Sequence, residues 1–234
     1  MAKRPANMPS AAGKVTPSSS IGVTPSPHNG LHVSRIIWQQ GKTIHRVHLD
    51  RYPGDAFNPG VAGNARFSPI QTSAGVAIPT LYGGTSFDCA AMETIFHDVP
   101  FMAGFKSYDK RKLIEQRHSV LVPDKDLALA DLSQVALRKM GIRRAELIDT
   151  EKDRYPDTRQ WAVAIYTQCP KIQGLRWISR QDDRAEAIVL FGDRIDTGTL
   201  VQTGAPRDIL ADANAYGDVL LLATAIGVHL VDGA

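Results

Sequence analysis

The sequence feature that most constrains this fold is a unit at residues 78–97, in which an extended segment, two glycines and a helix follow one another directly. Residues 78–82 alternate in the pattern of a short strand, and the pair Gly83-Gly84 is typical of a permissive turn. Thr85, with Asp88 three residues later, forms a capping-box pattern that predicts the start of a helix. The sequence therefore predicts a strand that ends at the two glycines and a helix capped by Thr85.

Glu93 interrupts the apolar stripe of that helix. Its neighbours one turn away are apolar on both sides, so its carboxylate projects from or beside the buried face, where an unpaired charge is costly. One interpretation is a surface carboxylate that reaches water or pairs with His97 at i+4. The other is a functional carboxylate. Tyr82 at the strand end and Arg66 just upstream favour a functional role, because an arginine, a tyrosine and a glutamate then share one compact unit.

Composition narrows the class of protein. The 234 residues suffice for one domain with a buried core, and a net charge of +3 is small for a module that binds duplex nucleic acid. Cys89 and Cys169 lack a metal-ligand spacing, and no apolar run reaches the length of a membrane span. His45 and His48 lie on opposite faces of an extended segment, which argues against a zinc pair. We expect a cytoplasmic protein without a metal, a membrane span or direct contact with nucleic acid.

The chain divides into a tail and one domain. Residues 1–30 are rich in Pro, Ser, Ala and Gly without apolar periodicity, which predicts a disordered or loosely ordered tail. Residues 31–234 form the expected single domain. The loop at 52–64 is dense in Gly, Pro and Asn, and it either closes over a ligand or connects elements at the surface. Strands are predicted at 43–49, 145–148, 174–178 and 187–191, and at 35–38, where a short helix is the alternative.

Helices account for the remaining segments. Residues 107–118 carry Lys and Arg around few apolar positions, which is typical of a solvated helix face, with phosphate or partner binding as the alternative. Further helices are predicted at 131–140 before Gly141, from Asp157 or Thr158 to a point before Pro170, and from about Pro206. Strands and helices mixed in this way, without internal repeats, predict an α+β fold.

Five segments carry a resemblance to a known family. They are, in order, HRVH around Arg46, NARFSP around Arg66, LYGGTSFDCAAMETIFH around Tyr82 and Glu93, then GLRWISRQ and AIVLFGDR. Over about residues 43–195 this order resembles the RES-domain proteins, best known as the toxins of bacterial toxin–antitoxin pairs. The resemblance implies an α+β, ADP-ribosyltransferase-like fold with a mixed, split β-sheet and flanking helices. It also implies an enzyme that consumes NAD, as a glycohydrolase, a phosphorylase or a mono-ADP-ribosyltransferase.

The same resemblance implies a role for individual residues. Glu93 is similar to the catalytic acid of the family, and Ser179 to the serine for which the family is named, with Thr158 as the rival. Tyr82 is similar to the ring that packs on nicotinamide and takes part in the site. Arg46 and Arg66 are similar to the residues that bind the NAD pyrophosphate or ribose, and Thr158 would join them in binding.

The partners implied by the resemblance are NAD, an Xre-type helix-turn-helix antitoxin whose C-terminal segment blocks the cleft, and a target protein if ADP-ribose is transferred. The alternative is a catalytically inactive NAD-binding or interaction module of the same fold. An unrelated hydrolase or nucleic-acid-binding domain is disfavoured, because the chain has no GxSxG motif, no P-loop and no basic helix with interleaved aromatic residues.

Overall fold

The computed structural model describes residues 23–233, and the expectation for residues 1–22 lies outside that range. Residues 23–30, which the sequence assigns to the tail, contact the domain. The Trp161 indole donates a hydrogen bond to Pro25 O at 2.7 Å, and Thr24 Oγ1 donates one to Glu146 O at 2.6 Å. Ordered packing therefore begins at about Thr24 instead of Leu31. The segment is held to the domain by hydrogen bonds, which an analysis of apolar periodicity does not detect.

The core of the fold is a mixed sheet of nine strands in the order β1-β8-β9-β10-β5-β2-β7-β11, with β12 also pairing with β7. The β8–β9 pair is parallel, and the other pairs are antiparallel. The strands are β1 (Arg35–Trp38), β2 (Ile44–Leu49), β5 (Thr80–Gly84), β7 (Gln116–Pro123), β8 (Leu127–Asp131), β9 (Gly174–Ile178), β10 (Glu186–Phe191), β11 (Leu200–Gln202) and β12 (Arg207–Asp208). The strands predicted at 35–38, 43–49, 174–178 and 187–191 are confirmed.

The sheet is split between its two middle strands. β5 pairs with β10 along its whole length, but it pairs with β2 only where Gly84 lies opposite His45. Away from that position the two strands diverge, so side chains of β2 and β5 line a space between them instead of closing a ladder. The predicted α+β architecture with a mixed, split sheet is therefore confirmed.

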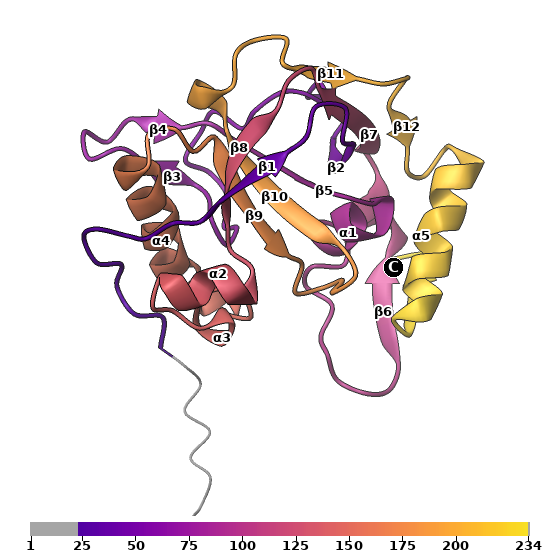
Figure 1. Ribbon diagram of the computed structural model, residues 1–234. Coiled ribbons are helices and arrows are strands. Elements are labelled where there is room, and N and C mark those ends of the chain that lie inside the picture. The colour runs from indigo at the N-terminus through magenta and orange to yellow at the C-terminus, as the bar shows by residue number, and fades with distance from the viewer. Residues whose placement is uncertain (1–22, 234) are drawn as a thin grey trace, which may run out of the picture.

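Five helices cover the sheet in the described part of the chain: α1 (Phe87–Met92), α2 (Gln134–Lys139), α3 (Arg144–Leu147), α4 (Tyr155–Gln168) and α5 (Ala213–Ala225). Figure 1 shows α2, α3 and α4 on one side of the central strands and α5 on the other. Trp161 and Ile165 of α4 pack with Trp177 of β9 in one apolar cluster, whereas Val219 of α5 packs with Ala91 of α1 in another. Helices therefore bury apolar side chains on both sides of the central strands.

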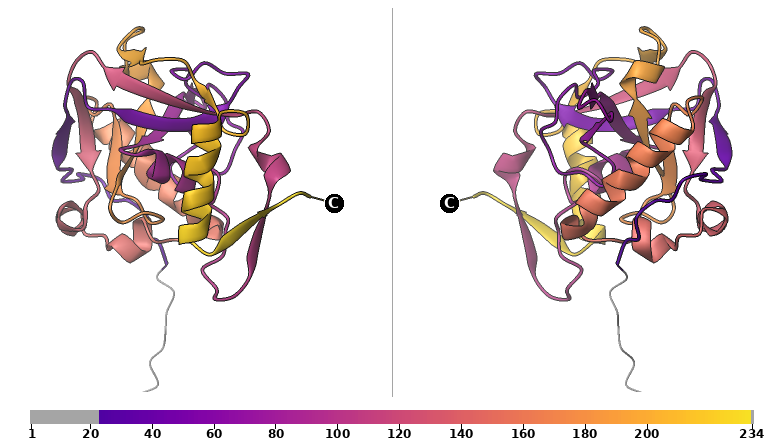
Figure 2. Two further views of the ribbon diagram at one scale, coloured as in Figure 1. Left: turned by 90° about the vertical axis from the view of Figure 1, so that its right-hand side faces the viewer. Right: turned by 90° about the vertical axis from the view of Figure 1, so that its left-hand side faces the viewer.

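Two short sheets complete the fold. β3 (Ile70–Gln71) pairs with β4 (Ala77–Ile78), and β6 (Lys106–Asp109) pairs in parallel with β13 (Val228–Val231). Figure 2 shows the β6–β13 pair beside α5, away from the central sheet. The helix predicted at 107–118 is wrong: this segment contains β6, one 3₁₀ turn at Lys110–Leu113 and the start of β7. Ile114 at ψ 137° ends the turn, because that backbone conformation cannot continue a helix, and Glu115 follows at φ 64°.

Two further predictions need correction. The strand predicted at 145–148 is helix α3, which begins where the Glu146 carboxylate accepts a hydrogen bond from Arg143 N at 2.8 Å. The helix predicted from about Pro206 begins at Ala213, because Asp212 caps it and the residues before it form β12 and a turn. The helix predicted at 131–140 is present as the shorter α2, because Asp131 still belongs to β8 and Ser133 is the N-cap. Gly141 beyond it adopts φ +72°, as a C-terminal glycine should.

A chain of hydrogen bonds ties the C-terminal region to the middle of the sheet. Arg207 donates to His118 Nδ1 at 2.9 Å, and His118 Nε2 contacts His45 Nδ1 at 3.0 Å. Because Arg207 occupies Nδ1 as a donor, the proton of His118 lies on Nε2 and is donated to His45. Burial, and then the charge of Arg207, lower the pKa of His118 to about 3. His118 is therefore a neutral structural link, and protonation would break it.

Candidate active site

The two glycines that end the predicted strand belong to it. β5 continues through Gly83 and Gly84, so the predicted turn at this pair is wrong. A Cβ atom on Gly83 would lie 2.4 Å from Ile44 Cγ2 of β2, and one on Gly84 would lie 2.6 Å from Cys89 Sγ of α1. Both positions require glycine, because a side chain at Gly83 would collide with β2 and one at Gly84 would collide with α1.

The helix that follows is shorter than expected. Ser86, not Thr85, is its N-cap, and the Ser86 hydroxyl accepts a hydrogen bond from Cys89 N at 3.0 Å. The predicted Thr85 cap is wrong, because Thr85 Oγ1 instead contacts β10, where it accepts a hydrogen bond from Glu186 N at 3.0 Å. α1 ends at Met92, and Glu93 is its C-cap. Glu93 therefore leaves the helix axis at its end and faces the space between β2 and β5.

The Glu93 carboxylate is held by Ser179. Ser179 Oγ donates to Glu93 Oε1 at 2.7 Å and accepts the backbone N–H groups of Gln181 and Asp182, each at 3.0 Å. Ser179 is fully buried. These contacts use the serine hydroxyl completely, so it fixes one orientation of the carboxylate. The sequence-predicted pair of Glu93 and Ser179 lies together in the structure.

Arg66 lies beside this pair and is buried. Its Nη1 donates to Thr150 O at 3.1 Å and to Thr150 Oγ1 at 2.6 Å, and its Nη2 donates to the Tyr155 hydroxyl at 3.4 Å. Burial lowers the pKa of the Arg66 guanidinium, while Tyr155 and Glu93 act in the opposite direction. The guanidinium remains a cation held in one plane, and the same side chain lines the cavity into which Glu93 points.

That cavity has a volume of about 230 Å³ and lies in the split of the sheet. It is lined by Val47, Ala65, Arg66, Tyr82, Gly83, Ala90, Glu93, Thr94, His97, Trp177 and Ala187. The Tyr82 hydroxyl accepts a hydrogen bond from Phe67 N at 2.9 Å, and its ring meets the Trp177 ring edge-on at 6.2 Å. Burial raises the pKa of Tyr82, so the phenol stays protonated. The cavity thus combines one carboxylate, one buried cation and an aromatic wall.

A second cavity of about 520 Å³ adjoins the first, and Val47, Ala65 and Tyr82 line both. Arg46 lines this second cavity. Its Nη1 donates to the carbonyl oxygens of Gly54 and Ala56, each at 2.6 Å, and burial lowers its pKa to about 10. Arg46 therefore ties the loop at 52–64 to β2 and adds a positive charge to the wall of this cavity.

Thr158, like Ser179, lines neither cavity. It lies inside the first turn of α4, which begins at Tyr155 with Arg154 as its N-cap, so the cap predicted at Asp157 or Thr158 is three or four residues too late. Its hydroxyl is fully buried and donates to Arg66 O and to Tyr155 O. Thr158 thus supports the backbone that carries Arg66. Ser179, not Thr158, contacts Glu93.

Sequence reasoning did not predict that His97 and Tyr155 belong to a hydrogen-bond network next to Arg66. His97 Nε2 contacts the Tyr155 hydroxyl at 2.9 Å, and His97 Nδ1 contacts Asp98 Oδ1 at 2.7 Å. His97 therefore does not pair with Glu93, as the surface interpretation of Glu93 required. The chain Asp98–His97–Tyr155–Arg66 instead braces the buried guanidinium. His97 and Asp98 are adjacent in sequence, but Tyr155 lies 58 residues from His97 and 89 residues from Arg66, and no spacing pattern links it to them.

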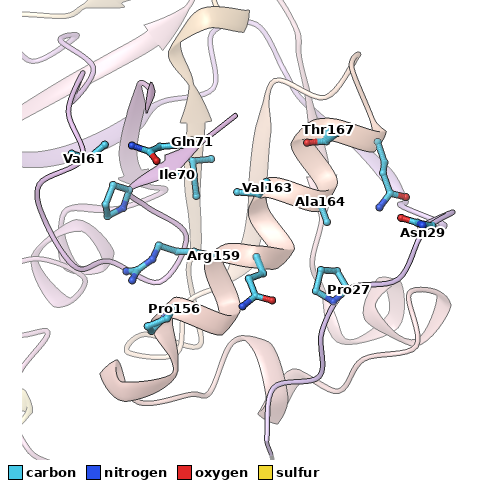
Figure 3. A pocket seen from close by; sticks show the side chains of 13 residues that line it. Pro27, Asn29, Val61, Ile70, Gln71, Pro156, Arg159, Val163, Ala164 and Thr167 are labelled. Atoms are coloured by element: carbon cyan, nitrogen blue, oxygen red, sulfur yellow. The ribbon is translucent and has the colours of Figure 1, made fainter. Parts of the chain in front are cut away.

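Another cavity lacks the residues needed for acid–base chemistry. A cavity of about 660 Å³ lies between α4 and β3, on the face of α4 that carries Val163 and Ala164 (Figure 3). Arg159 is its charged lining residue, and no carboxylate or histidine lines it.

Within residues 23–233 no group of three His, Cys, Asp or Glu side chains could hold a metal ion. In that same range, no helix is long and apolar enough to cross a membrane.

Comparison with known proteins identifies the family. The sequence model of the RES domain matches residues 43–210, which include all the predicted site residues. The chain belongs to the RES-domain family. A solved structure with the same fold is that of the M. tuberculosis MbcT–MbcA toxin–antitoxin complex, which is 14% identical, with a TM-score of 0.54 over 73% of this chain and 85% of that chain. No curated protein sequence matches this RES protein. All of α5 and all of β13 lie beyond the matched residues.

Proposed function

We propose that this RES protein consumes NAD by cleaving the bond between nicotinamide and ribose. The observation that carries the proposal is the Glu93 carboxylate, fixed by a buried serine inside a cavity that also contains Arg66 and Tyr82. Cleavage passes through an oxocarbenium-like state, in which positive charge develops on the ribose. A carboxylate already oriented beside the ribose stabilises that charge more than it stabilises bound NAD, which is the condition for catalysis.

The shapes and charges of the two adjoining cavities support this substrate. The smaller cavity has an aromatic wall of Tyr82 and Trp177 that suits the flat nicotinamide ring. The larger one, lined by Arg46, offers room for the rest of the dinucleotide. The Arg66 guanidinium is already held in one plane and carries permanent charge, which suits it to the pyrophosphate or ribose.

The three reactions open to this site differ only in the group that accepts ADP-ribose. Water gives a glycohydrolase, phosphate gives a phosphorylase, and a side chain of a target protein gives a mono-ADP-ribosyltransferase. In each case Tyr82 and Trp177 retain nicotinamide until the bond breaks, and Glu93 stabilises the ribose cation. NAD is a substrate in this account, and the reaction requires no metal.

Membership of the RES family, and the fold shared with a protein of the MbcT–MbcA complex, support a biological role as a toxin. We propose that an Xre-type antitoxin neutralises this protein by covering the cavities, and that loss of NAD or modification of a target protein makes it toxic. The two free cysteines fit a reducing cytoplasm, where NAD is available.

The test is to incubate the purified protein with NAD and to quantify nicotinamide and the ribosyl product. Nicotinamide release by the parent protein is expected, together with a higher KM for NAD in Arg66→Lys, which keeps the charge but loses the planar fork. A parent protein that binds NAD without releasing nicotinamide would instead support an inactive binding module.

A further inference from the structure

The larger of the two adjoining cavities, the one lined by Arg46, carries positive charge that its own wall does not balance. Among residues 23–233, Arg46 and Arg51 are its charged lining residues, and no Asp or Glu lines it. His48 also lines it, but burial lowers the pKa of this ring, so the ring is neutral at pH 7. An anion that enters the cavity therefore meets two cations and no carboxylate.

Arg46 is the inner of the two cations. Its Nη1 donates to the carbonyl oxygens of Gly54 and Ala56, which carry no net charge. Asp55 is the carboxylate whose charge acts on Arg46, but it lines a different cavity and forms no ion pair with the guanidinium. A cation that is withdrawn from water without an ion-pair partner is stabilised when an anion binds beside it.

Arg51 lies at the mouth of the same cavity. It is exposed, and its guanidinium carbon lies 5.3 Å from the centre of the Tyr52 ring. The neighbouring carboxylate, Asp50, instead faces Arg117, with 3.8 Å between Oδ2 and Nη2. Within residues 23–233 Arg51 forms no ion pair with a carboxylate, so its charge is available to an anionic group of a ligand.

Tyr52 indicates which part of a ligand reaches this mouth. It is 48% exposed, and it lines the cavity. An aromatic ring that is half open to solvent can stack on a nucleobase. Because Tyr82 lines both cavities, a dinucleotide with nicotinamide in the smaller one continues into the larger one. Its adenosine end is then the part that lies beside Tyr52 and Arg51.

The charge at this end of a dinucleotide site determines whether a phosphate is accepted on the adenosine ribose. Sites that select NAD place a carboxylate on the ribose 2′-hydroxyl, whereas sites that take NADP place an arginine nearby. The 2′-phosphate of NADP is a monoester with a charge of about −1.5 to −2 at pH 7, which a carboxylate repels and a guanidinium binds. The wall of this cavity contains the arginine and lacks the carboxylate.

We propose that this protein cleaves NADP as well as NAD, and that Arg51 binds the 2′-phosphate of NADP. The proposal rests on the proposed function, because the same cavities and the same Glu93 carboxylate would act on both substrates. The reaction at the ribose C1′ is unchanged. The electron pair of the broken C1′–nicotinamide bond leaves with neutral nicotinamide, and with water as the acceptor a water oxygen bonds to C1′ and loses one proton. The products are nicotinamide, 2′-phospho-ADP-ribose and one proton.

The experiment gives the purified full chain NAD and NADP as separate substrates, and nicotinamide release yields kcat/KM for each. We expect the kcat/KM for NADP to lie within about tenfold of that for NAD, because no group of the cavity wall repels the additional phosphate. Raising the NaCl concentration from about 20 mM to about 300 mM should lower the NADP-to-NAD ratio of kcat/KM, because salt screens exposed charges.

Matched variants locate the phosphate. Arg51→Gln should lower the NADP-to-NAD ratio of kcat/KM about three- to fivefold, the upper part of the range for an exposed ion pair. Arg51→Lys keeps the charge but loses the bidentate fork, so its ratio should lie between those of the parent and of Arg51→Gln. Arg35→Gln is the control, because Arg35 is an exposed arginine of β1 that lines neither cavity. Its ratio should equal that of the parent.

The outcomes separate this proposal from the proposed function. Nicotinamide release from NAD with a kcat/KM for NADP more than about tenfold lower would overturn the proposal and leave NAD cleavage standing. Cleavage of both substrates with the same ratio in the parent, Arg51→Gln and Arg35→Gln would also overturn it, because the phosphate would then not contact Arg51. Absence of nicotinamide release from both substrates would overturn both proposals.

Discussion

Replacing Ser179 with alanine should separate the structural and catalytic parts of the site. The hydroxyl of this fully buried side chain accepts two backbone N–H groups and donates to Glu93. Ser179→Ala leaves those donors without an acceptor, and a buried unsatisfied donor costs about 1–3 kcal/mol. We expect the free energy of unfolding to fall by about 2 kcal/mol, which lowers the melting temperature of a domain of this size by about 4–8 °C.

The same substitution should affect catalysis separately. Without its donor the Glu93 carboxylate is free to rotate, and a hydrogen bond to a charged group is worth about 1.5–3 kcal/mol, so kcat for nicotinamide release should fall about 10- to 100-fold. The KM for NAD should change little, because Ser179 does not line the NAD cavities. Thermal unfolding and steady-state kinetics measure the two effects.

Ser133→Ala is the matched control for this prediction. Ser133 caps α2, where its hydroxyl accepts a hydrogen bond from Ala136 N. Its loss should cost about 1 kcal/mol of stability without any change in nicotinamide release. If Ser179→Ala behaves like Ser133→Ala, with lower stability and full kcat, the hydroxyl does not orient Glu93 and the reasoning fails.

Three further predictions follow from the contacts. Tyr155→Phe removes the hydroxyl that accepts from Arg66, so the KM for NAD should rise about 3- to 10-fold with little change in kcat, as measured by steady-state kinetics. The pKa of His118 is lowered on folding, so between about pH 3 and 6.5 the unfolded state binds a proton that the folded state does not. The free energy of unfolding, measured in urea, should therefore be highest above about pH 6.5 and fall as the pH decreases towards about 3. The profile of His118→Gln should be flatter. Deletion of residues 1–30 should lower the melting temperature, because the Trp161 indole then loses its acceptor at Pro25; an unchanged melting temperature would contradict the packing of residues 23–30.

Much of the site could be predicted from sequence because its residues lie in short segments with recognisable spacing. Tyr82 and Glu93 are separated by one strand end and one short helix, so local periodicity together with the family resemblance places them in one unit. The reason for the two glycines could not be predicted. They are required by the approach of β2 and of Cys89, which are contacts made in the folded chain.

The network behind Arg66 was also beyond prediction. Thr150 and Tyr155 reach Arg66 across more than eighty residues of sequence, and neither stands in a pattern that points to an arginine. The errors at 107–118 and 145–148 have a related cause. Charged residues dominate the first segment, but its buried residues are Leu113 in the 3₁₀ turn and His118, which pairs with Val47 of β2. The second is too short for its apolar residues to distinguish a strand from one turn of helix.

The Glu93 carboxylate drives NAD cleavage in the proposed function, and this role is tested directly by comparing nicotinamide release by the parent and by Glu93→Gln. Glutamine keeps the size of the side chain and can still meet Ser179, but it removes the charge that acts on the ribose cation. We predict that turnover falls by about two orders of magnitude or more while NAD affinity and thermal stability change little. Glu146→Gln, at a carboxylate that caps α3, should retain full activity. Nicotinamide release at the parental rate by Glu93→Gln would contradict the account.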